Sequence, residues 1–145
     1  MNAVILPPDV YVADTGTSKG RGVFANRDYL KGEIVERAPV VILLRPFDQL
    51  PPRLQPLLFN WGSLTHAAPC SAIALGFGSF YNHDNPSNMQ FAADTESSLL
   101  IYTTVRAIKK HEELTVNYNS GDGSPTSDNN RWFDQFGITP IVSES

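Results

Sequence analysis

The chain has 145 residues, of which 41% are hydrophobic and 10% aromatic, and its formal net charge is −4. This length and composition favour one globular domain over residues 1–145 with its own core, and they exclude a disordered protein. The mild negative charge argues against a direct nucleic-acid binder, which would carry a basic patch, and it suits a basic protein partner.

Short runs rich in Val, Ile, Phe, Tyr and Thr alternate with turn residues, which predicts a mainly β protein. The expected strands are 10–13, 22–25, 34–36, 40–44, 89–92, 99–104 and 114–117. We also expect a helix over 53–60, because Pro56 would lie near its first turn, and a single helical turn at 79–81.

The composition changes after Tyr118, so we place the end of the domain core there and its beginning near residue 10. Residues 119–130 are rich in Ser, Gly, Asp and Asn, which predicts a flexible loop. Residues 131–137 then bring three aromatic side chains together and end in glycine, which predicts a short helix that folds back onto the domain.

A single cysteine, Cys70, excludes an internal disulfide and any zinc site that needs several cysteines. In its apolar context we expect a small buried side chain. The longest apolar run, 40–44, is too short to cross a bilayer, and residues 1–8 lack the pattern of a signal peptide. We therefore expect no membrane partner and an intracellular location, cytoplasmic or nuclear.

Three polar segments are candidates for a functional site. The first is Lys19, Gly20, Arg21 and Gly22, where glycines permit a tight turn or the close approach of a ligand. A strand is expected to follow, so this segment has neither the spacing of a P-loop nor that of a dinucleotide fold. A plain β-turn is the competing interpretation.

The second segment runs from Asn82 to Asn88, and the third is 113–118, a half-buried strand that ends in Tyr118. Adjacent side chains of an extended segment point in opposite directions, so His83 and Asp84 do not form a ready metal site, and we expect none. From the residues alone, the second segment is equally well explained as a turn of hydrogen-bonded amides. Tyr118 is explained as a core-edge tyrosine.

In this order and at these separations, the three segments resemble the signature motifs of SET-domain protein lysine methyltransferases, over about residues 10–118. The resemblance is to the small, single-domain type without cysteine-rich zinc modules. It implies a β-clip fold of several small curved sheets with a few short helices. In that fold, the Asn82–His83 segment and the strand ending at Tyr118 cross in a C-terminal pseudoknot.

The resemblance implies transfer of a methyl group from S-adenosylmethionine to a lysine amine of a protein or peptide. The substrate would be histone-like or another basic protein. The enzyme would act as a monomer or a homodimer. Tyr118 would be the catalytic residue. The implied cofactor-binding residues are Lys19, Gly20, Arg21, Gly22, Asn82, His83, Trp132 and Phe133. The implied lysine channel is lined by Tyr81, Phe91, Tyr102 and Val116. Each aromatic of the channel has a core alternative, which is the stronger interpretation for Tyr102.

The chain departs from the family pattern at Asp84, where serine is usual, and this places a carboxylate near the expected cofactor. It also has no tyrosine in 36–41, where a weaker family motif is expected. We treat that absence as uninformative, and Asp84 is the feature that favours the alternative function, a non-catalytic SET-like module that binds a peptide or protein partner. A third possibility is an unrelated β-rich binding domain. We further expect Arg106 to pair with an acidic residue.

Overall fold

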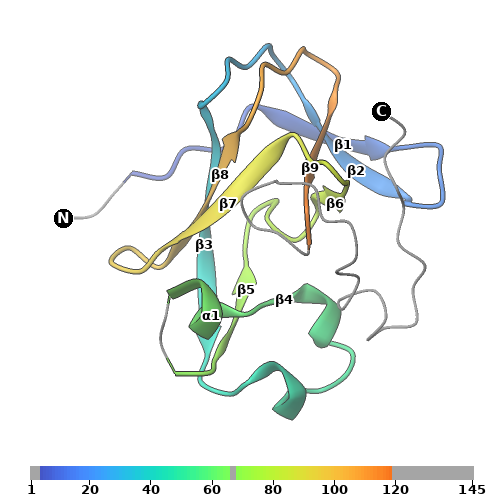
Figure 1. Cartoon of the computed structure of the whole chain (residues 1–145). Coiled ribbons are helices and arrows are strands. Elements are labelled where there is room, and N and C mark those ends of the chain that lie inside the picture. The colour runs from blue at the N-terminus through green and yellow to red at the C-terminus, as the bar shows by residue number, and fades with distance from the viewer. Residues whose placement is uncertain (1–3, 66–67, 119–145) are drawn as a thin grey trace.

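The computed structural model describes residues 4–65 and 68–118, and its regular structure there is mostly β-strand in two small sheets (Figure 1). The first sheet has the strand order β1 (Val10–Asp14), β2 (Arg21–Ala25), β9 (Glu113–Val116) and β6 (Asn82–His83). The second has the order β4 (Leu58–Phe59), β5 (Ser71–Ala74), β3 (Ile34–Leu43), β8 (Leu99–Thr104) and β7 (Met89–Asp94). The mainly β prediction is confirmed.

Helical structure in the described ranges is limited to two 3₁₀ turns, η1 (Phe47–Gln49) and η2 (Gln55–Leu57), and one short helix, α1 (Trp61–Thr65). None of these elements has the length and apolar character needed to cross a membrane. The predicted helix over 53–60 is confirmed only as the 3₁₀ turn η2, which has Pro56 at its start, and the prediction is wrong from Leu58 onward. Leu58 and Phe59 instead extend and pair with Ile73 and Ala72 of β5, because sheet pairing satisfies their backbone groups and lets Leu58 be buried.

The two strands predicted at 34–36 and 40–44 are one continuous strand, β3. Its first half pairs with β8 from Ile34 to Pro39, and its second half pairs with β5 from Val40 to Leu43. The prediction placed a break at Pro39 because proline has no N–H group to donate to a neighbouring strand. In the structure Pro39 stays within β3, and its carbonyl accepts a hydrogen bond from the Leu75 N–H. The predicted helical turn at 79–81 is wrong: residues 76–80 form a non-helical turn, in which the Phe80 N–H bonds to the Phe77 carbonyl.

The core lies between the two sheets and is rich in tyrosine. Tyr29, Tyr81 and Tyr102 are at most 2% exposed and pack with the apolar side chains of β2, β3, β8 and β9. Cys70 lies partly buried against this core. Buried tyrosines need hydrogen-bond partners for their hydroxyl groups, and those partners organise the site described below.

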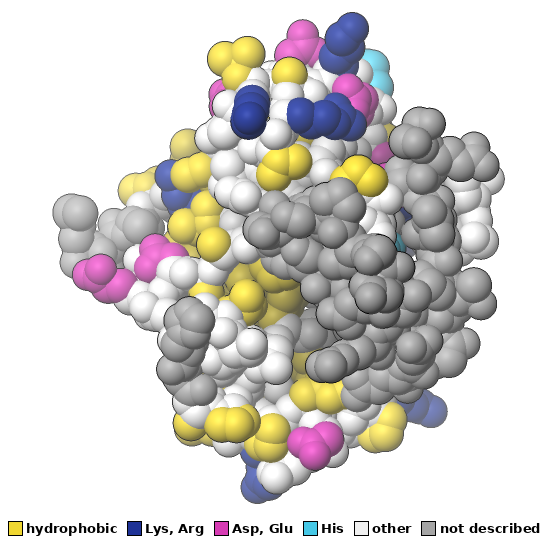
Figure 2. All heavy atoms as spheres, in the orientation of Figure 1, with side chains coloured by type: hydrophobic (Ala, Val, Ile, Leu, Met, Phe, Trp, Pro, Cys, Tyr) yellow, Lys and Arg dark blue, Asp and Glu magenta, His cyan; other side chains and the backbone are white. Residues whose placement is uncertain are grey.

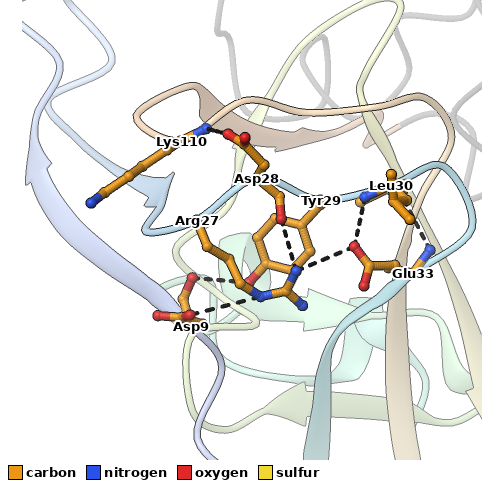
Figure 3. A network of polar contacts seen from close by, with 8 residues as sticks. Asp9, Arg27, Asp28, Tyr29, Leu30, Glu33 and Lys110 are labelled. Atoms are coloured by element: carbon orange, nitrogen blue, oxygen red, sulfur yellow. Dashed lines mark hydrogen bonds and ion pairs between the residues drawn. The ribbon is translucent and has the colours of Figure 1, made fainter.

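A polar network around Arg27 fixes the first sheet against the segment that leads into β3 (Figure 3). The Arg27 guanidinium lies 3.8 Å above the centre of the Tyr29 ring and forms ion pairs with Asp9 and Glu33. The Tyr29 hydroxyl donates to the Asp9 carbonyl, and the Lys110 N–H donates to Asp28. Residues 9, 27–33 and 110 are thereby held together from three distant parts of the chain.

The expected ion pair of Arg106 is confirmed, with Glu112 as its partner at 3.0 Å. Both side chains are partly exposed, so the pair contributes little to stability by itself. On the face seen in Figure 2, hydrophobic side chains gather in the middle, whereas Lys and Arg at the top edge are interspersed with Asp and Glu.

Thr104 gives a test of this framework. Its buried hydroxyl donates to the Leu30 carbonyl at 2.6 Å and accepts from the Glu33 N–H at 3.1 Å. We expect Thr104→Val to lower the free energy of unfolding by about 1–3 kcal/mol in urea titrations, because it leaves buried polar groups with fewer partners. The matched control is Thr103→Val on the same strand, which is expected to change it by less than about 0.5 kcal/mol. Equal effects would contradict this account.

Candidate active site

Parallel pairing of β6 with β9 brings together two motifs that are thirty residues apart in sequence. Asn82 lies opposite Thr115 and His83 opposite Val116, and the Asp84 N–H continues the ladder to the Val116 carbonyl at 3.1 Å. Parallel strands need a long crossover, and here β7 and β8 supply it. The predicted meeting of the Asn82–His83 segment with the strand ending at Tyr118 is confirmed.

Asn88 fixes this crossover on β9. Its side-chain oxygen accepts from the Thr115 N–H at 2.8 Å, and its amide nitrogen donates to the Glu113 carbonyl at 2.7 Å. The side chain is 5% exposed and therefore acts as a one-residue strand partner for β9. The structure assigns Asn88 a role in holding the site together.

Asn82 joins the glycine segment to β9. Its amide nitrogen donates to the Arg21 carbonyl at 3.0 Å and to the Glu113 carboxylate at 2.8 Å. Both partners are acceptors, so the amide orientation is fixed with its oxygen directed away from them. A Cβ atom at Gly22 would lie 2.5 Å from the Glu113 Oε2 atom, so only glycine lets these groups approach this closely.

The preceding loop is closed by its own backbone. The Thr15 N–H bonds to the Gly20 carbonyl at 2.8 Å, and Gly20 has φ of +74°, a conformation that favours glycine. A Cβ atom at Gly20 would meet nothing within 4 Å, so the backbone there is open to approach. Both interpretations of this segment, a tight turn and a surface that a ligand can reach, are compatible with this geometry.

His83 is 7% exposed, and its Nδ1 atom accepts a hydrogen bond from the Tyr118 N–H at 3.1 Å. Burial lowers the pKa of His83 to about 4; the nearby Asp84 charge opposes this shift and the Lys19 charge adds to it. The ring is therefore neutral near pH 7 and carries its proton on Nε2. This neutral form is the one that can hold the Tyr118 backbone.

Tyr118 is partly buried and is held at a second point, because its hydroxyl donates to the Tyr81 carbonyl at 2.9 Å. Burial, and to a smaller extent the Glu113 charge, raises the pKa of Tyr118 to about 12. The side chain is therefore a neutral phenol with a directed hydroxyl near pH 7. Such a group can orient and hydrogen-bond a reactant, but it does not supply a ready base.

The predicted channel aromatics form a continuous group of rings. Tyr81 and Tyr102 have ring centres 4.7 Å apart, and Phe91 lies 6.1 Å from Tyr102 and 5.4 Å from Phe59. The fully buried Tyr102 donates its hydroxyl to the Gly78 carbonyl, which favours its core alternative. Val116 is 2% exposed on β9.

Asp84, where the chain departs from the family pattern, lies at the edge of a cavity. Its carboxylate accepts from the neighbouring Asn85 N–H at 2.8 Å and lines a cavity of about 540 Å³. The other lining residues are Pro86, Ser87, Asn88, Val105, Arg106, Glu112, Glu113 and Thr115. None of the predicted cofactor residues in the described ranges is among them. The charge of Asp84 also raises the pKa of His83, against the larger opposite effect of burial.

Two acidic residues of the site, Glu36 and Glu113, were missed by the sequence analysis. Glu36 is a carboxylate inside a β-rich apolar run, a signal that could have identified it. Trp132 and Phe133, together with the predicted loop 119–130 and helix 131–137, lie outside the described residues. Within residues 4–65 and 68–118, no group of three or more His, Cys, Asp or Glu side chains could hold a metal ion.

Comparison with known proteins gives a consistent result. A family model described as "SET domain" matches residues 20–119. A Schizosaccharomyces pombe histone-lysine N-methyltransferase, specific for H3 lysine-37, is 29% identical over 118 residues, which cover 81% of this chain and 78% of that protein.

Two solved structures show the same fold. A Plasmodium falciparum candidate histone methyltransferase has a TM-score of 0.62 at 22% identity, and the match covers 78% of this chain and 95% of that one. A humanized mutant of the Chaetomium thermophilum Polycomb Repressive Complex 2, bound to the inhibitor GSK126, has a TM-score of 0.60 at 20% identity. That match covers 83% of this chain and 16% of the larger one.

The neutral His83 predicts a pH dependence of stability. Its pKa of about 4 in the folded protein lies below its ordinary value of 6.5, so the unfolded chain binds more protons between these values. We expect its contribution to be complete above about pH 6.5 and to fall by up to about 3 kcal/mol as the pH drops toward 4.

Urea titrations across this range measure the effect. His83→Gln should show a shallower loss of stability toward low pH than the wild type. An unchanged slope in His83→Gln would show that His83 is not the titrating group.

Proposed function

This chain belongs to the SET-domain family, and on that premise we propose that it transfers a methyl group from S-adenosylmethionine to a lysine amine of a histone-like protein. The family match and the relative of known class make it a protein-lysine N-methyltransferase, as predicted from its three motifs. The observation that carries the proposal is the double attachment of Tyr118, through its hydroxyl to Tyr81 and through its N–H to His83.

The residues that would hold the cofactor fit its chemistry. Both N–H donations of the Asn82 amide are directed at protein acceptors, which leaves its oxygen to accept from the cofactor's ammonium group. The positive charge of Lys19 lowers the pKa of His83, and it is complementary to the negative charge of the cofactor's carboxylate. The open backbone at Gly20 allows the close approach that the glycine segment predicts. Trp132 and Phe133 remain the proposed cover for the adenine.

Bound S-adenosylmethionine supplies an electrophilic methyl group on a positively charged sulfur. The task of the protein is then to align a neutral lysine amine with that methyl group and to exclude water. Apolar walls disfavour the charged form of lysine, so we propose that Tyr81, Phe91 and Val116 line its channel and lower the lysine pKa. The Tyr118 hydroxyl, kept protonated by burial, orients the reacting groups.

The substrate proposal rests on the relative that acts on a histone and on the chain's net charge of −4, which suits a basic substrate. Under this proposal the protein works inside the cell, in the cytoplasm or nucleus, as a monomer or homodimer, without direct contact to nucleic acid or membrane. Incubating the pure protein with labelled S-adenosylmethionine and a panel of basic proteins, followed by mass-spectrometric site mapping, tests it.

Asp84 is the observation that favours the alternative, a non-catalytic module that binds a peptide. Calorimetry separates the two functions, because the alternative predicts no heat on titration with S-adenosylmethionine. None of the predicted cofactor residues in the described ranges lines the cavity at Asp84, which supports the enzyme.

Asn82 and Asp84 give a paired test of the cofactor site. We expect Asn82→Ala to weaken S-adenosylmethionine binding about tenfold or more in calorimetric titrations, because it removes the oxygen proposed for the ammonium group. Asp84→Ser is expected to stay within about threefold of the wild type, because that side chain lines a cavity to which none of the predicted cofactor residues in the described ranges contributes. The reverse order of effects would place the cofactor elsewhere.

Tyr118→Phe tests the catalytic assignment. The variant keeps the aromatic ring and loses the hydroxyl with its bond to Tyr81, and we expect fold and cofactor binding to persist. We expect kcat to fall about a hundredfold or more in assays with labelled methyl groups. A variant with the full wild-type rate would exclude Tyr118 as the catalytic residue.

A further inference from the structure

We propose that Glu36 is a positioning residue for the catalytic Tyr118 and acts through Tyr81. This inference rests on the proposed methyltransferase function and assigns a role to a carboxylate that lies outside the three motifs. Glu36 belongs to β3 in the middle of the second sheet, whereas Tyr118 follows the end of β9 in the first sheet. The turn formed by residues 76–80, together with Tyr81, connects them.

The Glu36 carboxylate binds both ends of this turn. Its Oε1 atom accepts the Tyr81 hydroxyl at 2.6 Å, and its Oε2 atom accepts the Phe77 N–H at 3.0 Å. The turn wraps so closely that a Cβ atom at Gly76, where φ is +64°, would lie 2.5 Å from Oε2. Glu36 thus holds the backbone where the turn begins and the side chain where it ends.

Tyr81 passes this constraint to Tyr118. Its hydroxyl is held by Glu36 and its ring packs on Tyr102, so its carbonyl has little freedom. That carbonyl accepts the Tyr118 hydroxyl at 2.9 Å. A phenol has a single hydrogen to donate, so the position of this acceptor fixes the direction of the hydroxyl. His83 follows two residues later in the same segment, and its Nδ1 atom accepts a hydrogen bond from the Tyr118 N–H.

A role in stability alone explains Glu36 less well. The residue is 4% exposed, and burial raises its pKa while the bonds from Tyr81 and Phe77 lower it. Carboxylates buried this far from water are costly, and an apolar side chain usually serves a core better. Glu36 accepts hydrogen bonds from Phe77 and Tyr81. Both belong to the segment whose Tyr81 carbonyl accepts the hydrogen bond from the Tyr118 hydroxyl.

Steady-state kinetics of two variants test the proposal. Tyr81→Phe keeps the ring in place and removes the hydroxyl. In Glu36→Gln, the amide can accept from only one of the two donors, because its NH₂ group faces the other. We expect both to lower kcat about tenfold or more while KM for the peptide changes less than about threefold, because the hydroxyl of Tyr118 loses its direction.

Two control variants separate this effect from lost stability. Glu33→Gln makes the same chemical change at a carboxylate that binds Leu30 and Arg27, far from Tyr118 in the hydrogen-bond network. Thr104→Val removes buried hydrogen bonds elsewhere. Both should keep the wild-type kcat at temperatures where they are folded. If they lose as much kcat as Tyr81→Phe, Glu36 has only a structural role and the proposal is overturned.

A double-mutant cycle gives the sharper result. If Tyr81 acts through the Tyr118 hydroxyl, then Tyr81→Phe should lower the single-turnover rate in the wild type but not in the Tyr118→Phe background. Independent, additive losses would overturn the proposal. Because the cycle compares rates, it also requires an active wild type.

Nuclear magnetic resonance tests the inference without an activity assay, because it reports directly on the surroundings of the Tyr118 hydroxyl. With tyrosine labelled by ¹³C at Cζ, the Tyr118 signal is the one missing from Tyr118→Phe. We expect this signal to shift in Glu36→Gln and Tyr81→Phe and to stay in place in Glu33→Gln. An unmoved signal overturns the proposal. A moved signal in a protein without methyltransferase activity would support the Glu36 linkage and count against the proposed function.

Discussion

The parallel pairing of β6 with β9 is the constraint on which the rest of this structure depends. Two residues of β6 form a very short ladder, which would be weak by itself. The side chain of Asn88 reinforces it by bonding to the backbone of Glu113 and Thr115 in a buried setting. Each of those bonds is strengthened by the exclusion of water. The crossover through β7 and β8 is thus fixed at both ends.

This pairing explains why the candidate site is made of neutral, oriented groups. His83 is kept neutral by burial and Tyr118 is kept protonated by burial, and each is hydrogen-bonded to its neighbour across the pairing. The carboxyl groups of the site, those of Glu36 and Glu113, are held by donors from turns and strands. A reaction that needs alignment of a neutral amine, with no metal-bound or carboxylate base, suits such surroundings.

The local pattern of residue types predicted most of the strands, but it did not predict that 34–43 is one continuous strand or that 58–59 is extended. The strands at 10–13, 22–25, 89–92, 99–104 and 114–117 were found within a residue or two, because β-branched and aromatic runs bounded by turn residues mark them. The error at 53–60 arose because an apolar run fits a helix or a strand equally well. There, pairing with β5 decided the outcome. Very short strands such as β6 leave no periodic signal.

What the sequence alone determined was the β-rich class and, through three ordered motifs, the family and the identity of Asn82, His83 and Tyr118 as site candidates. Only the tertiary structure decided which groups hold them: Glu113 for Asn82, Tyr81 for the Tyr118 hydroxyl, and Glu36 for Tyr81. The partners in these contacts lie 31, 37 and 45 residues apart. Periodicity reports only which face of its own element a side chain occupies, so it carries no information about partners that the crossover brings from another sheet.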